Sequence, residues 1–213
     1  MGRPFSDRRD AGRQLAEALA HHPIDDPLVL GLPRGGVPVA FEVALALGAR
    51  LDVIVARKIG APANPEFGIG AIAEGGGAAL ASDTVRALRI SDDELQWIIE
   101  REQAELHRRV ATYRGERRLP AATGRDVVLV DDGLATGVTA EAALRSLRAQ
   151  QPARLLLAVP VGPPETVRRL VPPADEVVCV VSTRHLTAVG AWYQDFTQTT
   201  DDEVLELLAG GAA

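Results

Sequence analysis

The chain has 213 residues, 46% of them hydrophobic and 24% charged, and its formal net charge is −6. This composition indicates one globular domain, and the acidic balance argues against a general nucleic-acid surface, which needs many Lys and Arg residues to neutralise phosphates. A single cysteine, Cys179, excludes an intrachain disulfide and a site built from several cysteines. No apolar run is long enough to span a bilayer, so we expect a cytoplasmic protein that binds neither membrane nor nucleic acid.

Short apolar runs bounded by Gly, Pro and polar residues predict strands. These strands are residues 28–32, 51–60, 68–74, 126–130, 154–161 and 176–181. Helical spacing of apolar residues predicts helices at residues 10–20, 37–48 and 91–114, after Gly137, after Pro164, and at 201–208. Because strands and helices alternate and the strands are almost continuously apolar, we expect an α/β fold with a parallel sheet covered by helices on both faces.

The helix predicted at residues 91–114 is the least usual element. Ser91 and Glu94 form a capping box at its start, and its apolar residues share one face while the other face is heavily charged. The simplest explanation is that the charged face is exposed to solvent. The alternative is that this face packs against another helix or against a second copy of the chain. We expect one domain over residues 1–213, with a helical insertion at about 82–120.

The segment 127–139 carries the strongest chemical pattern. Four apolar residues are followed by Asp131 and Asp132, and then by small residues that turn into a helix. A buried parallel strand delivers such acids to the carboxyl edge of the sheet, where ligands bind in open α/β folds. The turn aims backbone N–H groups and the hydroxyls of Thr136 and Thr139 at a phosphate above the helix N-terminus. Acids beside a phosphate site fit a ligand that also carries hydroxyls or a metal, as a sugar phosphate does.

Two other interpretations account for less of this segment. A dinucleotide-binding turn requires G-x-G-x-x-G after the strand, and neither this segment nor residues 32–38 contain it. An acidic metal pocket would use the two Asp residues without any need for the Thr-Gly-Val-Thr loop.

The segment 127–139 closely resembles the phosphoribosyl pyrophosphate motif of type I phosphoribosyltransferases, and the resemblance extends over most of the chain. It implies the type I fold, a central, mainly parallel sheet flanked by helices, with a small C-terminal hood at 182–213 together with the N-terminal segment. It also implies that Asp131 and Asp132 hold the ribose 2′- and 3′-hydroxyls and help to order Mg²⁺ through water. The residues implied to hold the 5′-phosphate are Gly133, Leu134, Ala135, Thr136, Gly137, Val138 and Thr139.

Residues 32–36, Leu-Pro-Arg-Gly-Gly, follow the first predicted strand. Alone, this sequence would indicate only a turn. In this context it resembles the family's pyrophosphate loop, whose backbone, often bent by a cis peptide, presents amides to the leaving group. Pro33, Gly35 and Gly36 would form that loop, the glycines allowing close approach of the backbone, and Arg34 would add positive charge.

Lys58 is the only lysine in a chain with 22 arginines. With Arg57 it precedes residues 60–68, rich in Gly and Pro, which match in order the mobile active-site loop of the family. By that resemblance Lys58 is a catalytic candidate that stabilises the departing pyrophosphate, and Arg57 is a binding candidate. A surface lysine at the end of a strand explains Lys58 equally well.

The acceptor side is less defined by the sequence. Glu66 could act on a proton of the acceptor, and Trp192, Tyr193 and Phe196 could form a hood over an acceptor ring. Solvent exposure of Glu66 and core packing of the aromatic residues are the simpler explanations. Ala135 stands where enzymes for 6-oxopurines usually carry an acid, which argues against a 6-oxopurine as the acceptor.

The resemblance implies Mg²⁺-dependent transfer of 5-phosphoribosyl from phosphoribosyl pyrophosphate to a nitrogenous, nucleobase-like acceptor, with release of pyrophosphate. The catalytic candidates are Arg34, Lys58, Asp131 and Asp132. The alternative is a sensor that binds phosphoribosyl pyrophosphate without transferring it, and hydrolysis of the donor is a third option. The sequence does not identify the acceptor, and a homodimer is a family expectation.

Overall fold

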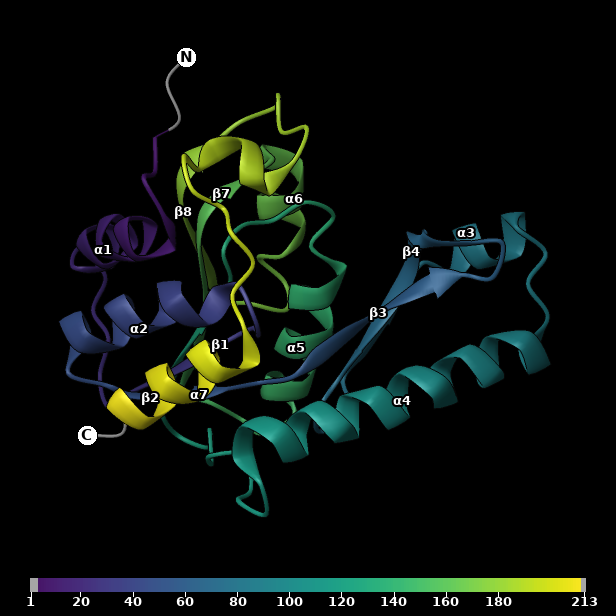
Figure 1. The fold of residues 1–213 in the computed structure, drawn as a ribbon, viewed down its shortest axis with the longest axis horizontal. Helices are drawn as coiled ribbons and strands as arrows, with labels where there is room; N and C mark the ends of the chain where they lie inside the picture. Colours follow the sequence, from purple (N-terminus) through teal and green to yellow (C-terminus); the bar gives the residue numbers. More distant parts are fainter. Residues whose placement is uncertain (1–3, 212–213) are drawn as a thin grey trace.

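The computed structural model describes residues 4–211. Five parallel strands form the central sheet in the order β2-β1-β6-β7-β8 (Figure 1). Their bounds are β1 Pro27–Gly31, β2 Arg50–Val53, β6 Asp126–Val130, β7 Arg154–Gly162 and β8 Glu176–Ser182. Because β1 and β6 are neighbours in register, the loops that follow these two strands meet at the carboxyl edge of the sheet.

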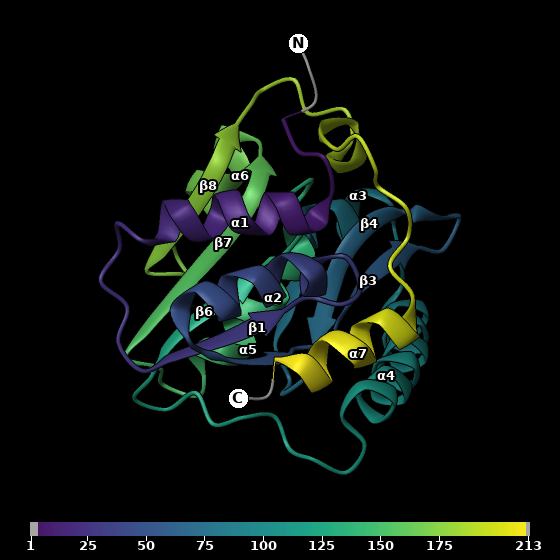
Figure 2. The same ribbon diagram turned by 60° about the vertical axis from the view of Figure 1, so that its left-hand side comes forward.

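Helices cover both faces of this sheet, as the apolar strands predict. One face carries α1 (Arg8–Leu19), α2 (Gly36–Leu47) and α7 (Asp201–Gly210), and the other carries α5 (Val138–Arg148) and α6 (Pro164–Arg169). Figure 2 shows α1 and α2 lying across the strands. The side chains of β1 alternate between the two cores, with Val29 in the first and Leu28 and Leu30 in the second.

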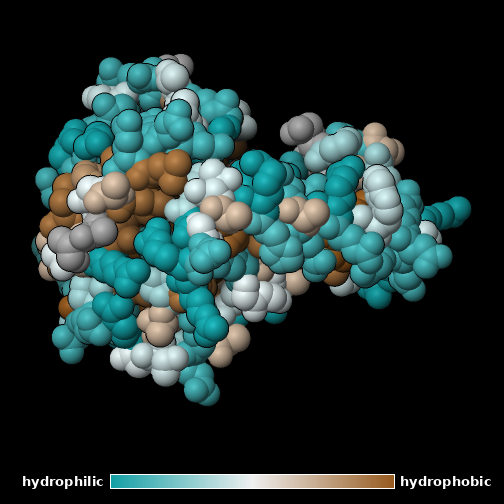
Figure 3. Space-filling view, turned by 60° about the horizontal axis from the view of Figure 1, so that its bottom comes forward, coloured by the Kyte–Doolittle hydropathy of each residue, from teal (hydrophilic) through white to brown (hydrophobic). Residues whose placement is uncertain are grey.

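A second sheet forms an arm that projects from the body, to the right in Figure 1. The arm consists of the antiparallel strands β3 (Ala56–Ala61), β4 (Asn64–Ala73) and β5 (Ala78–Leu80), followed by the helices α3 (Ser82–Ala87) and α4 (Asp92–Arg114). The buried side chains of Ile98 and Leu106 pack α4 against the strands. The outward surface of the arm is mostly hydrophilic in Figure 3, which agrees with a solvated face of the long helix.

Both ends of α4 are fixed by polar contacts. Ser91 Oγ accepts a hydrogen bond from Glu94 N–H at 3.3 Å, so the predicted cap is confirmed. At the other end the buried Arg114 donates to Asp52 at 3.3 Å and forms an ion pair with Glu74. This buried pair joins the base of the arm to the central sheet.

The single strand predicted at residues 51–60 is wrong. The chain forms β2, which pairs in parallel with β1, and then β3, which pairs antiparallel with β4. Between them Ile54 N–H donates to Gly31 C=O at 3.2 Å, and Glu74 N–H donates to Val55 C=O at 2.8 Å. The backbone thus stays hydrogen-bonded while it changes sheets, and an unbroken apolar run gives no sign of the change.

The segment after β8 rises over the carboxyl edge of the sheet and includes a 3-10 turn, η1 (Val189–Trp192). It packs against the N-terminal segment, where Phe5 is fully buried and forms a bridge with Tyr193. Residues 1–3, 212 and 213 of the predicted hood lie outside the described residues. No helix within residues 4–211 combines the length and apolar content needed to cross a bilayer.

Candidate active site

Two loops meet at the carboxyl ends of β1 and β6. Leu32 N–H, at the start of the first loop, donates to Val130 C=O at 2.9 Å. Gly35 lies so close to the second loop that a Cβ atom there would be 2.0 Å from Asp132 Oδ2. The two segments singled out in the sequence therefore form one continuous surface.

A cavity of about 400 Å³ opens beside the second loop. Its lining residues are Lys58, Gly68, Asp131, Gly133, Leu134, Ala135, Thr136, Gly137, Thr139, Ala140 and Val189. Lys58 and Gly68 come from the arm, Val189 comes from η1, and the others follow β6. The fold thus brings Lys58 and Asp131, which belong to different sheets, to one space.

Asp131 and Asp132 follow directly after β6. Asp132 N–H donates to Asp131 Oδ1 at 2.9 Å, which orients the first carboxylate. Burial and the neighbouring Asp132 raise the pKa of Asp131 well above its usual value. Burial also raises the pKa of Asp132, and the Arg8 guanidinium opposes that rise. A cation or hydroxyl donors entering the cavity would stabilise the charged form of this pair.

The acidic pair fits Mg²⁺ better than a metal that needs a full set of protein ligands. Mg²⁺ usually keeps several waters and binds one or two carboxylates together with phosphates of the substrate. Within residues 4–211 no group of three or more His, Cys, Asp or Glu side chains is arranged to hold a metal. Asp131 and Asp132, beside a cavity with a phosphate-type loop, match this sparse donor set.

The loop between Asp132 and α5 has a fixed shape. Gly137 has a φ of 73°, and a Cβ atom there would lie 2.7 Å from Thr166 Cγ2, so a glycine is required. Thr166 Oγ1 donates to Ala135 C=O at 3.2 Å, and Arg169 donates to Thr136 C=O. Because the first N–H groups of a helix have no intrahelical acceptor, this loop has the geometry of an anion site.

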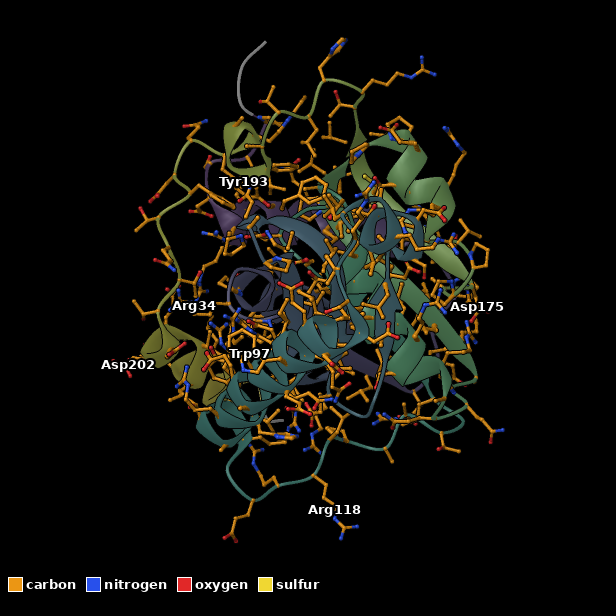
Figure 4. The ribbon with its side chains drawn as sticks, turned by 90° about the vertical axis from the view of Figure 1, so that its right-hand side faces the viewer. Arg34, Trp97, Arg118, Asp175, Tyr193 and Asp202 are labelled. Carbon is orange, nitrogen blue, oxygen red and sulfur yellow. The ribbon has the colours of Figure 1, made fainter. Side chains whose placement is uncertain are left out.

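The loop after β1 contains a cis peptide bond between Pro33 and Arg34, in agreement with the resemblance. Arg34 does not line the cavity in this structure. Its Nη1 lies 3.7 Å from Asp201 Oδ1 at the start of α7, and its side chain is 28% exposed. Figure 4 shows Arg34 between the segment of Tyr193 and α7. The guanidinium is therefore at the edge of the site, held by an ion pair longer than a hydrogen bond.

Neighbouring residues of β3 point to opposite sides, as in any strand. Lys58 lines the cavity, whereas Arg57 turns to α4 and forms an ion pair with Glu102 at 2.7 Å. The structure therefore does not bring Arg57 to the other candidate residues. Its role in the structure is to join β3 to α4.

The mobile loop predicted at residues 60–68 is instead the hairpin of β3 and β4 at the tip of the arm, and only Pro62 and Ala63 lie between the two strands. Residues 61–64 and Phe67 line a separate hollow with Leu88, Ile90 and Glu94, and only Gly68 reaches the cavity beside Asp131. Glu66 belongs to β4, and its side chain lies outside the described part of the structure.

The aromatic residues near the C-terminus pack against one another. Tyr193 is fully buried, with its ring centroid 5.3 Å from that of Phe5 and 4.9 Å from that of Phe196. Its hydroxyl donates to Asp132 C=O at 2.6 Å, and burial raises its pKa. Tyr193 thus supports the backbone of Asp132 and does not present its ring to a ligand, whereas Trp192 and Phe196 are only partly buried.

Arg8 is a functional candidate that no sequence pattern indicates. Its Nε donates to Asp132 Oδ2 at 2.9 Å across the site. Asp7 caps α1 by accepting from Asp10 N–H at 2.8 Å, so the helix begins earlier than predicted. This cap could have been found from the sequence and would have placed Arg8 in the first turn, but nothing in the sequence links Arg8 to Asp132.

Comparison with known proteins agrees with this geometry. Residues 7–189 match the family model for the phosphoribosyl transferase domain. Two curated relatives from Mycobacterium tuberculosis, strains CDC 1551 / Oshkosh and ATCC 25618 / H37Rv, are each 49% identical over 205 residues, 96% of this chain and 46% of the relative. Their names give phosphoribosyl transferase as a provisional assignment, and the chain spans about half of their length.

Among solved structures, TT1426 from Thermus thermophilus aligns with a TM-score of 0.82 and 48% identity, covering 98% of this chain and 99% of that chain. The architecture is thus the type I phosphoribosyltransferase fold, and the chain belongs to the phosphoribosyl transferase domain family.

Proposed function

We propose that this chain transfers the 5-phosphoribosyl group from phosphoribosyl pyrophosphate to a nitrogenous acceptor, with Mg²⁺ as cofactor. The observation that carries the proposal is the cavity shared by Asp131, Thr136, Thr139 and Lys58. It combines acceptors for sugar hydroxyls, a helix N-terminus for a phosphate, and a cation for a leaving group. Membership of the family and the relatives above support phosphoribosyl pyrophosphate as the donor.

The donor would be held at two points. The carboxylates of Asp131 and Asp132 accept hydrogen bonds from the ribose 2′- and 3′-hydroxyls. The backbone N–H groups of residues 135–139, with the hydroxyls of Thr136 and Thr139, donate to the 5′-phosphate. Leu134 N–H already donates to Val161 C=O at 2.8 Å. With both ends of the ribose phosphate fixed, C1′ has one position in the site, which lowers the entropic cost of reaching the transition state.

Mg²⁺ bound near the acidic pair would neutralise negative charge on the pyrophosphate. It would also compensate the negative charge of the two carboxylates. The chain's own residues do the rest. The N–C1′ bond forms while the bond from C1′ to the pyrophosphate oxygen breaks, with inversion at C1′ through an oxocarbenium-like transition state. Pyrophosphate leaves with the electron pair of the broken bond, and the acceptor nitrogen gives its proton to solvent. Lys58 stabilises the negative charge that develops on the pyrophosphate. From the first loop the Gly35 amide adds to this, as does Arg34 once its side chain leaves Asp201. Gly36 N–H already donates to Leu32 C=O at 3.0 Å.

The proposal is tested by a product assay with phosphoribosyl pyrophosphate, Mg²⁺ and pooled nucleobases. Pyrophosphate release and a phosphoribosylated base, detected by mass spectrometry, are expected for the wild type. Asp131→Asn should lose both signals, and Asp93→Asn, which changes an exposed carboxylate on the arm, should keep them.

Two outcomes would contradict transfer. Ribose 5-phosphate formed without any acceptor would indicate hydrolysis of the donor. Donor binding with neither product would indicate a sensor.

A further inference from the structure

Arg8 connects three parts of the chain at the candidate site. Its Nε donates to Asp132 Oδ2 at 2.9 Å, and its Nη1 donates to Thr197 C=O at 2.8 Å. Its guanidinium carbon lies 3.8 Å from the centroid of the Phe196 ring. One side chain on α1 thus joins an acid of the donor site to the C-terminal segment.

This pair differs from the exposed ion pairs elsewhere on the surface. The side chains of Arg8 and Asp132 are only 11% and 16% exposed, so water screens their attraction weakly. An Arg that also donates to a carbonyl and stacks on a ring has few alternative orientations. The bond therefore restricts Asp132 to one rotamer.

The rotamer of Asp132 has little freedom on its other side. A Cβ atom on Gly35 would lie 2.0 Å from Asp132 Oδ2 and 3.1 Å from Arg8 Nε, so the first loop touches both groups. The Tyr193 hydroxyl donates to Asp132 C=O and so fixes the backbone at Asp132. Arg8 is the one cation that contacts Asp132 among the described residues, and it occupies the side of the carboxylate next to the C-terminal segment.

We propose that Arg8 is a positioning residue for the donor ribose, which orients Asp132 and couples occupancy of the donor site to the C-terminal segment, residues 195–199. This inference rests on the proposed function and goes beyond it, since it assigns a role to a residue outside both loops. A ribose hydroxyl bonded to Asp132 adds a contact to a side chain that already holds Arg8, and Arg8 in turn holds the carbonyl of Thr197 and the ring of Phe196. The segment is therefore more ordered when the donor is bound.

Substitutions of Arg8 separate orientation from coupling. Arg8→Gln removes the charge and the fork of donors. Arg8→Lys keeps a charge that can reach Asp132, but a single ammonium cannot hold Asp132, Thr197 and the Phe196 ring in the same arrangement. Arg9→Gln is the matched control, because Arg9 lies next along α1, pairs with Glu42 at 3.1 Å and is 49% exposed.

The first readout is calorimetric titration of phosphoribosyl pyrophosphate in the presence of Mg²⁺. Arg8→Gln should weaken donor binding about tenfold or more, as expected for loss of a charged hydrogen bond that orients a ligand-binding carboxylate. Arg8→Lys should bind within about threefold of the wild type, and Arg9→Gln should match it.

The second readout is hydrogen exchange of residues 195–199 with and without the donor. Exchange in this segment should slow on donor binding in the wild type and in Arg9→Gln. It should not slow in either Arg8 variant, even in Arg8→Lys, which still binds the donor. A residue with only a stabilising role would change exchange equally in the free and bound states.

Unchanged donor affinity in Arg8→Gln, together with donor-dependent protection like that of the wild type, would overturn the inference and leave the proposed function intact. A wild type that does not bind the donor would overturn both. If Arg8→Gln does not fold, Arg8→Lys decides the matter, because retained protection of residues 195–199 in that variant would also overturn the coupling.

Discussion

Gly35→Ala tests the contact between the two loops most sharply. The added methyl group would meet Asp132 Oδ2 at 2.0 Å and Asp132 Cγ at 2.8 Å. Ordinary contact begins at about 3.4 Å, so the carboxylate would have to move by about 1.4 Å or the first loop would have to withdraw. The side chain cannot retreat without breaking its bond to Arg8.

The expected effect is on donor binding first. A hydrogen bond to a charged group is worth about 1.5–3 kcal/mol, so loss of one such bond between Asp132 and the ribose should raise the Kd for phosphoribosyl pyrophosphate about 10- to 150-fold. Overpacking should also lower the free energy of unfolding by about 1–3 kcal/mol, which leaves the protein folded at room temperature.

Calorimetry measures the affinity, and denaturant unfolding measures the stability. Gly210→Ala is the matched control, since a Cβ atom there would meet only Phe41 Cε2 at 3.6 Å, an ordinary contact. A Gly35→Ala protein that binds the donor as tightly as the wild type would refute the view that these two loops form a single rigid site.

Three further predictions follow from particular contacts. Lys58→Gln should lower turnover at least tenfold while changing the donor Kd less than threefold, since Lys58 acts on charge that develops in the transition state. Steady-state kinetics measures turnover and calorimetry measures the Kd. Equal changes in turnover and in Kd would show that Lys58 only binds the donor. Tyr193→Phe should lower the free energy of unfolding by about 1–3 kcal/mol, because the buried C=O of Asp132 loses its donor, and an unchanged urea midpoint would contradict this. Burial, and then the hydrogen bond to Asp201, raise the pKa of Tyr113 to about 12, so the folded state keeps this proton above the pH at which the unfolded chain loses it. The stability contributed by Tyr113 should therefore be complete below about pH 10 and be lost as the pH rises to about 12. If the free energy of unfolding changes with pH in the same way for the wild type and Tyr113→Phe over this range, the prediction is wrong.

The parts of the fold that depend on local pattern could be predicted from the sequence. The four residues before Asp131, 127–130, are apolar and buried in β6, and the residues after it form the turn and the helix α5 as expected. Ser91, the predicted N-cap, also marks the start of α4 correctly. In each case the sequence signal and the structural cause lie within a few residues of each other.

The remaining features depend on contacts between distant segments. The apolar run 51–60 serves two sheets because Ile54 pairs with Gly31 and Val55 with Glu74, partners that its own sequence cannot reveal. The strand period places Arg57 and Lys58 on opposite faces, but only the position of α4 decides which face meets the cavity.

The aromatic residues near the C-terminus illustrate the same limit. The sequence left a hood over a ring and core packing both open, and Tyr193 adopts core packing because Phe5, from the other end of the chain, covers it. The contact of Arg8 with Asp132 likewise joins the first helix to the central loop. Long-range packing of this kind has no signature in a single sequence.

Under the proposed function, the acidic pair after β6 forms a Mg²⁺-dependent site for phosphoribosyl pyrophosphate. Calorimetric titration of that donor, with and without Mg²⁺, into the wild type and Asp132→Asn measures this binding. We expect binding by the wild type that requires Mg²⁺ and is lost or weakened at least tenfold in the variant. Absence of binding by the wild type, or equal binding by Asp132→Asn, would contradict it.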